Sequence, residues 1–346
     1  MTQYLFFGGF MLFVVLMLAL DLGVFHKKDH VIGMKEAAVW TVVWIAMSLV
    51  LSVVILFRAE WIHGIESQQQ LLDYGRAFLP GLLSEANSFE ANLKIYRQEM
   101  FEQYLAGYFL EKSLSIDNIF VMMMIFISFG IPKEYYHRIL FWGILGAIVL
   151  RFIFIFALGA IISEFAWVLA VFGVILLFSG AKMFKNSDDE RIDHERHPIV
   201  RFCSKYFRAT PHLDGHNFFT RIEGKRYITP LFIVLLVIEF SDIIFAVDSI
   251  PAVFSVTTDS FIVYFSNIFA IMGLRSLFFL LDGMKDKFYL LSYGLGCLLI
   301  FIGLKMILGI CLPGFHIGTT VSLCVILGIL LFSIVFSLIF PKKQQQ

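Results

Sequence analysis

Long apolar stretches alternate with polar segments along the whole chain. A membrane-spanning helix needs about 20 mostly apolar residues, because the hydrocarbon layer is about 30 Å thick and each helical residue rises about 1.5 Å. About nine stretches meet this requirement, near residues 4–24, 38–57, 104–130, 137–158, 161–181, 229–256, 261–281, 288–310 and 316–340. The pattern predicts an all-α fold, a polytopic membrane helix bundle of about nine spans.

Composition narrows the class further. Hydrophobic residues make up 59% of the 346 positions and charged residues 16%, whereas soluble domains have roughly 45–50% apolar and about 25% charged residues. The 27 basic and 27 acidic residues cancel, so no net field attracts nucleic acid. The four cysteines lack the spacing of a disulfide framework. A soluble globular protein, a nucleic-acid-binding protein and a secreted disulfide scaffold are therefore excluded.

Lysine and arginine mark alternate loops. They concentrate after the first, third, fifth and seventh predicted spans and in the tail, whereas the opposite side carries them only in residues 58–100. Loops rich in these residues stay on the cytoplasmic side of the membrane. The distribution predicts an N-terminus outside, a C-terminus in the cytoplasm and an odd number of spans.

The same pattern divides the chain into six segments. They are two N-terminal spans (1–57), an external insert (58–100), a first three-helix repeat (101–181), an internal charged loop (182–228), a second three-helix repeat (229–310), and a last span with its tail (311–346). The internal loop holds His194, His197, Cys203, His212 and His216. A metal relay through them is one interpretation, and solvated surface histidines are the favoured one.

Two of the predicted spans contain carboxylates in matching order. Glu111 and Asp117 lie six residues apart in the third span, as Asp242 and Asp248 do in the sixth. Asn118 then aligns with Ser249, one residue after the second acid. In the following span of each unit, Gly-Ala-Ile-Val-Leu-Arg151 has its counterpart in Ala-Ile-Met-Gly-Leu-Arg275.

The two matching units run in opposite directions. By the charge distribution, the third span enters the cell and the sixth leaves it. Inverted repeats are a recurring construction of secondary transporters, whose binding site lies near the middle of the bilayer at the repeat interface. The sequence therefore predicts two inverted three-helix repeats with a site between them.

The acidic residues need partners. A carboxylate at the centre of the bilayer costs about 2.5–3.5 kcal/mol on insertion scales, so these side chains should face a polar cavity, cations or a bound ion. The candidate ligands are Asp21, Glu111, Asp117, Asn118, Glu239, Asp242 and Asp248. Three cations, Lys112, Arg151 and Arg275, are candidate counter-charges, and they cannot neutralise six acids.

Ligand chemistry limits the ion. The motifs offer carboxylate, hydroxyl and amide oxygens and contain no cysteine or histidine. Oxygen-rich sites suit Mg²⁺, Ca²⁺ and Mn²⁺ and disfavour copper and zinc. A straight helix cannot aim acids six and nine residues apart at one ion. Either several helices contribute, or the third and sixth spans are broken near the motif, for which Pro251 and nearby serines are candidates.

Several stretches of the chain resemble the TerC family of integral membrane proteins, and within it the Alx-type manganese exporters. The resemblance implies an inner-membrane protein that lowers cytoplasmic Mn²⁺ by efflux. The insert is longer than the family's usual link, which makes it a candidate surface for an external protein partner. The matching stretches are residues 20–26, 111–120, 141–146, 229–231, 239–252 and 266–275.

Three functions remain open at this point. The first is export of a divalent cation, Mn²⁺ above all, in exchange for protons at the intramembrane carboxylates. The second is a membrane scaffold or assembly factor that recruits partners through its two large loops. The third is an amine or amino-acid exporter, with Arg151 or Arg275 as anchor for a substrate carboxylate. No ATPase or catalytic motif is present, so we expect neither an enzyme nor a cofactor.

Overall fold

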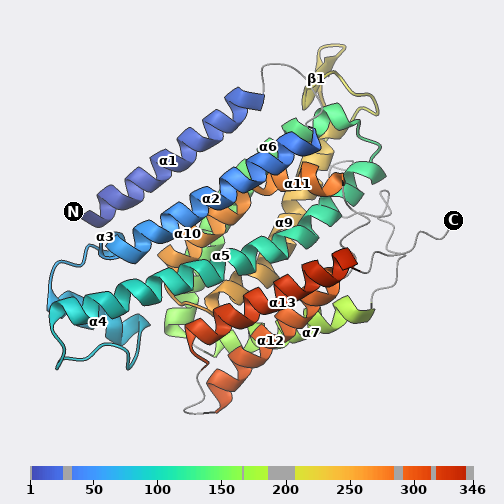
Figure 1. Ribbon diagram of the computed structural model, residues 1–346. Coiled ribbons are helices and arrows are strands. Elements are labelled where there is room, and N and C mark those ends of the chain that lie inside the picture. The colour runs from blue at the N-terminus through green and yellow to red at the C-terminus, as the bar shows by residue number, and fades with distance from the viewer. Residues whose placement is uncertain are drawn as a thin grey trace.

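The computed structural model describes residues 2–25, 33–165, 167–185, 207–283, 291–312 and 317–339. Long helices run side by side, and a small β-hairpin projects from one end of the bundle (Figure 1). The helices are α1 (Thr2–Phe25), α2 (Met34–Arg58), α3 (Glu60–His63), α4 (Gln68–Phe78), α5 (Phe89–Ser128), the short 3-10 helix η1 (Lys133–Tyr135), α6 (Tyr136–Glu164), α7 (Val168–Lys185), α9 (Pro230–Phe254), α10 (Ser260–Met272), α11 (Leu274–Asp282), α12 (Leu291–Cys311) and α13 (Thr319–Ile339). The hairpin consists of β1 (Phe219–Ile222) and β2 (Lys225–Ile228).

The helices confirm a polytopic membrane protein. Within the described residues, five helical segments are long and apolar enough to cross a membrane, at Met34–Arg58, Lys133–Glu164, Pro230–Phe254, Tyr293–Cys311 and Thr319–Ser337. A sixth span results if α10 and α11, bent by 41° at a break, count as one. The apolar parts of α1 and α7 are shorter, and α5 carries many charged residues. Nine spans therefore stay a prediction.

The helices that carry the acidic motifs are continuous, and a bend occurs elsewhere. Both α5 and α9 continue through their acidic motifs, so the alternative that the third and sixth spans are broken there was wrong, and the alternative that several helices contribute the acids is left. Ser113 and Ser241 donate to the carbonyl oxygens of Phe109 and Val237, four residues earlier in their own helices, which satisfies both hydroxyls without a break. Pro251 lies inside α9, which continues past it to Phe254. The bend occurs instead at Gly273, between α10 and α11.

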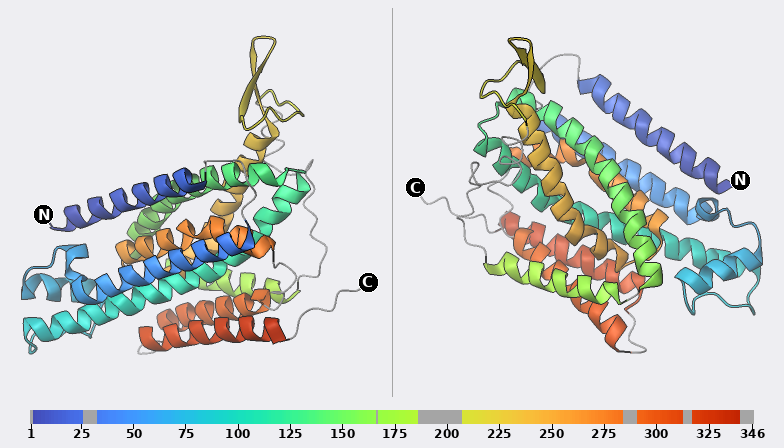
Figure 2. Two further views of the ribbon diagram at one scale, coloured as in Figure 1. Left: turned by 45° about the horizontal axis from the view of Figure 1, so that its top comes forward. Right: turned by 180° about the vertical axis from the view of Figure 1, so that it is seen from behind.

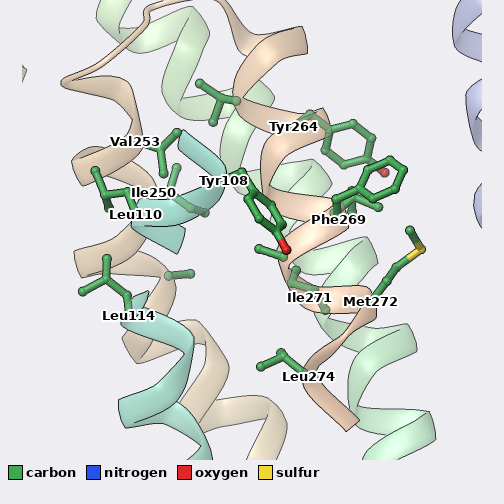
Figure 3. Close-up of a cluster of buried hydrophobic side chains, with 14 of the residues drawn as sticks. Tyr108, Leu110, Leu114, Ile250, Val253, Tyr264, Phe269, Ile271, Met272 and Leu274 are labelled. Carbon is green, nitrogen blue, oxygen red and sulfur yellow. The ribbon is translucent and has the colours of Figure 1, made fainter. Parts of the chain in front are cut away.

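The core forms where α5 passes between α9 and α10. Figure 3 shows Leu110 and Leu114 of α5 beside Ile250 and Val253 of α9, with Tyr108 on the side of α10. Each of these side chains is less than 9% exposed. The backbones approach closely as well, since a Cβ at Gly107 would lie 2.8 Å from the Ser266 hydroxyl oxygen. Apolar packing at this crossing fixes the position of both acidic motifs.

The segment between α2 and α5 folds over one end of the bundle. Ser67 begins α4 with a capping box: its hydroxyl accepts from the Gln70 amide, and Gln70 reaches back to the Ser67 backbone. In Figure 1, α3 and α4 lie at the end of the bundle where α1 begins, opposite the hairpin. The insert thus covers the end of the bundle that the charge distribution assigns to the outside.

A buried polar network attaches this insert to the bundle. His63 Nε2 lies 2.9 Å from Asp259 Oδ2, and the Tyr74 hydroxyl donates to the same oxygen at 2.6 Å. His63 Nδ1 is 2.7 Å from the Tyr96 hydroxyl oxygen. Asp259 also begins α10, where its Oδ1 accepts from the Phe261 amide at 2.9 Å. Burial acts to raise the pKa of Asp259, but the His63 charge and these hydrogen bonds outweigh it and lower the pKa.

We predict that Asp259→Asn destabilises the protein by about 3–5 kcal/mol, because an amide cannot accept all the hydrogen bonds that the buried carboxylate accepts from Tyr74 and the Phe261 amide beside His63, and such bonds to a charged group contribute about 1.5–3 kcal/mol each. The check is the thermal unfolding midpoint in detergent. The folded pKa of Asp259 lies below its unfolded value of about 3.9, so this contribution is present above that pH and is lost as pH falls through the folded pKa. The matched control is Asp73→Asn, whose carboxylate pairs with Arg76 at the exposed surface. Equal midpoints for both variants at pH 7 would contradict the prediction.

Candidate ion-binding site

One buried arginine holds part of the predicted site together. Arg151 of α6 is completely buried. Its guanidinium donates two hydrogen bonds to Asp242 of α9, from Nη2 to Oδ1 at 3.0 Å and from Nε to Oδ2 at 3.4 Å. Nη1 donates to a carboxylate oxygen of Glu111 on α5 and, at 3.0 Å, to Oδ1 of Asn267 on α10. The planar guanidinium has five donors and can therefore bond several side chains at once. Arg151 thus connects four helices, α5, α6, α9 and α10.

This group contains the first acid of each motif. Glu111 and Asp242 occupy matching positions in the two units, and both now contact the single cation Arg151. One guanidinium therefore supplies a single positive charge to two carboxyl groups. Two atoms of the residues that contact Arg151 have no hydrogen-bond partner in the described structure. They are Glu111 Oε2 and Asn267 Nδ2.

The second acid of each motif lines a cavity and does not contact Arg151. Asp117 and Asn118 of α5 line a cavity of about 490 Å³ together with Asp248 and Ser249 of α9. These are two consecutive aligned pairs of the repeat. Asn118 Nδ2 and Ser249 Oγ are buried and have no hydrogen-bond partner in the part of the chain that is described. Unpaired buried polar atoms are costly, so the cavity is suited to a polar or charged occupant.

Helix α7 closes this cavity with polar residues that the sequence analysis missed. Ser179 Oγ donates to Asp248 Oδ1 at 3.2 Å, and Lys182 also lines the space. The available signal was a serine near the end of an otherwise apolar span, followed by a lysine three residues later. The remaining walls are mostly apolar, formed by Leu114, Val121, Met124, Phe178, Met183, Ile244, Phe245 and Leu299.

Two other predicted residues, Glu239 and Lys112, neither bond to Arg151 nor line the cavity. A Cβ at Gly146 of α6 would meet the Glu239 carboxylate, and Glu239 Oε2 has no hydrogen-bond partner among the described residues. Lys112 donates to the Ala270 carbonyl oxygen at 3.2 Å, close to the bend between α10 and α11. Its partner is therefore a backbone carbonyl at the end of a helix, where a cation is favoured.

Arg275 and Asp21 complete the predicted set. Arg275 Nη1 lies 2.8 Å from His137 Nε2. Asp21 belongs to α1, but its side chain is not among the parts that the structure describes. His194, His197 and Cys203 of the internal loop also lie outside the described residues. The seven predicted ligands thus do not form one cluster. Among the described residues, no three His, Cys, Asp or Glu side chains converge as a metal site would require.

Known proteins share most of this sequence. Residues 96–345 match the family described as "Integral membrane protein TerC family". The chain belongs to this family. Among its relatives, the "Putative membrane-bound redox modulator Alx" of Escherichia coli (strain K12) is 41% identical, over 96% of this chain and 94% of that protein. A membrane protein of Myxococcus xanthus is 44% identical, over 96% and 91% of the two chains.

The same Alx name is given to a Salmonella typhi protein that is 42% identical, over 96% of this chain and 94% of that one. No solved structure matches this one. The TerC family match begins within α5 and contains all the described polar residues of the two groups. The resemblance predicted from the motifs is therefore confirmed at the level of the family.

We predict that Arg151→Met lowers the stability of this TerC-family chain by about 3–5 kcal/mol, because Glu111 and Asp242 would stay buried without their cation. The check is the unfolding midpoint in detergent. Adding Glu111→Gln and Asp242→Asn to the same chain should recover most of the loss, because the buried negative charge is then gone. Arg151→Met alone with an unchanged midpoint would show that the pairing carries no stability.

Proposed function

We propose that this TerC-family protein exports a divalent cation, Mn²⁺ in preference, from the cytoplasm across the inner membrane in exchange for protons. The observation that carries the proposal is the cavity in which Asp117 and Asn118 meet Asp248 and Ser249. It offers two carboxylates with amide and hydroxyl oxygens, the ligand types that suit hard divalent ions. Such an ion would keep part of its water shell, since two carboxylates do not fill its coordination sphere.

The packing supports a transporter made of two inverted units, α5 to α7 and α9 to α12. A two-fold relation between the units requires that contacts occur in matching pairs. The first helix of one unit, α5, packs on the second helix of the other, α10, and in the same way α9 packs on α6. The third helices, α7 and α12, pack on each other. In our proposal these units rock about the cavity and open it to either side.

The arrangement of the ends supports the proposed orientation. The insert, the 255–259 loop and the start of α13 lie at one end of the bundle, and the hairpin lies at the other (Figure 1). The sequence assigned the first group to the outside and the hairpin to the cytoplasm. We therefore propose nine spans, with the N-terminus outside and the C-terminus inside.

Arg151 makes an amine or amino-acid exporter a weaker candidate. That function needs a cation to anchor the substrate carboxylate, and Arg151 already contacts Glu111, Asp242 and Asn267. A second candidate comes from the printed name of the Alx relatives, redox modulation. The free thiols of Cys297, Cys311 and Cys324 lie exposed on α12 and α13 and could carry it. The polar cavity favours ion export over both.

We expect Asp117→Asn and Asp248→Asn each to reduce Mn²⁺ flux at subsaturating concentration by about tenfold or more, since each removes a charged ligand. The measurement is Mn²⁺, Ca²⁺ and Mg²⁺ movement in proteoliposomes with and without a pH gradient. Asp73→Asn, an exposed carboxylate of the insert, is the matched control and should transport normally. Full flux in both cavity variants would refute the site, and absence of any divalent flux in wild type would favour a scaffold. A variant with all four cysteines replaced by serine that transports normally would separate export from thiol chemistry.

We expect Lys182→Gln to lower the KM for Mn²⁺ several-fold, because a lysine that lines a cavity repels the incoming cation. The stoichiometry of ions to protons should not change. Initial rates in the same proteoliposomes give the KM, and they should be compared with those of Lys225→Gln, an exposed lysine of the hairpin remote from the cavity. An unchanged or increased KM in Lys182→Gln would contradict the expectation.

A further inference from the structure

The β-hairpin at the end of the bundle has an unusual pair of residues. Its strands are antiparallel, and Arg221 lies directly opposite Arg226. Directly opposed residues of an antiparallel ribbon point to the same face, with Cβ atoms about 4.5–5.5 Å apart. Phe219 lies two residues before Arg221 and therefore shares that face. Lys225 pairs with Ile222 on the opposite face.

Two like charges in this position repel each other. Cross-strand pairs of equal charge destabilise a sheet. Both arginines are exposed, and no carboxylate of the described residues forms an ion pair with either of them. A phosphate between two guanidinium groups would remove the repulsion and gain charge-assisted hydrogen bonds. The face is therefore complementary to a phosphate-bearing anion.

The hairpin stands where the chain enters the membrane. It leads directly into α9 and projects sideways from the helices (Figure 2). The Phe219 ring packs on Phe232 in the first turn of α9, with 4.7 Å between centroids. Phe218, next to it, contacts Trp142 of α6 and lies 4.9 Å below the Arg138 guanidinium. Aromatic residues with neighbouring cations are typical of the boundary between lipid and water.

One apolar ring on the arginine face is left open. Phe219 is 55% exposed, although it belongs to the same face as Arg221 and Arg226. A free phosphate would gain nothing from this ring, and a nucleic acid would need a wider cationic surface. A phospholipid satisfies both features, because its phosphate and its acyl boundary lie at adjacent depths. The cytoplasmic leaflet also attracts basic segments through its anionic lipids.

We propose that the hairpin binds the headgroup of an anionic phospholipid, with the phosphate between Arg221 and Arg226 and the glycerol–acyl boundary against Phe219. The assignment to the cytoplasmic leaflet rests on the proposed orientation. The binding itself does not depend on what the protein transports. The bound lipid holds the start of α9, and thereby one wall of the cavity, at a fixed depth in the membrane.

The test is native mass spectrometry of the full-length protein in detergent, titrated with phosphatidylglycerol or with phosphatidylcholine. We expect phosphatidylglycerol to bind more tightly. Each of Arg221→Gln and Arg226→Gln should lower its affinity about fivefold, from about 1 kcal/mol per basic residue at a membrane surface. The affinity for phosphatidylcholine should stay the same. Lys225→Gln is the matched control, since it removes an equal charge from the opposite face.

Three results would overturn the proposal. They are equal affinity for the two lipids, an equal loss in Lys225→Gln, or displacement of phosphatidylglycerol by an equal concentration of inorganic phosphate. The double arginine variant should melt no lower than wild type in phosphatidylcholine, because it loses only a repulsion. If it does melt lower, Arg221→Lys with Arg226→Lys decides. Retained phosphatidylglycerol preference in this charge-preserving variant supports the site, and its loss refutes it.

Discussion

Arg151 contacts carboxylates from two other helices in the centre of the bundle, where a lone charge would be very costly. Its guanidinium binds Asp242 with two nitrogens and also reaches Glu111 and Asn267. Removal of Arg151 would leave the two buried carboxyl groups without their cation. The four helices that supply these groups must therefore keep their relative positions. Three of them, α5, α9 and α10, also form the apolar crossing.

The geometry of a helix explains why only half of the acids belong to this group. Positions six residues apart are rotated by about 600°, which leaves their side chains about 120° apart around the axis. When Glu111 faces Arg151, Asp117 must face elsewhere, and the same holds for Asp242 and Asp248. Asp117 and Asp248, the second acids of the two motifs, line the same cavity beside α7. In our proposal the two acids of each motif have separate roles: the first holds the helices together, and the second binds an ion.

The two ends of the bundle are fixed by different chemistry. At the insert end, Asp259 binds His63 and Tyr74 in a closed polar network, which joins residues far apart in the chain. At the hairpin end, aromatic rings and arginines are presented at the start of α9 with part of their surface open. Since α9 begins beside the hairpin and ends near Asp259, both regions determine where its acids lie.

The class of protein and its family can be read from the chain alone, and the alignment of the two acidic motifs can be proposed from it. Apolar length, charge distribution and motif spacing are local properties of the chain, so these predictions needed no knowledge of tertiary contacts. The sequence could not show that Glu111 and Asp242 share Arg151 or that Ser179 joins Asp248. Nor could it show that the bend lies at Gly273 or that His63 reaches Asp259. These points needed the folded structure, because the partner of a buried charge depends on which helices pack together and on how each is rotated about its axis.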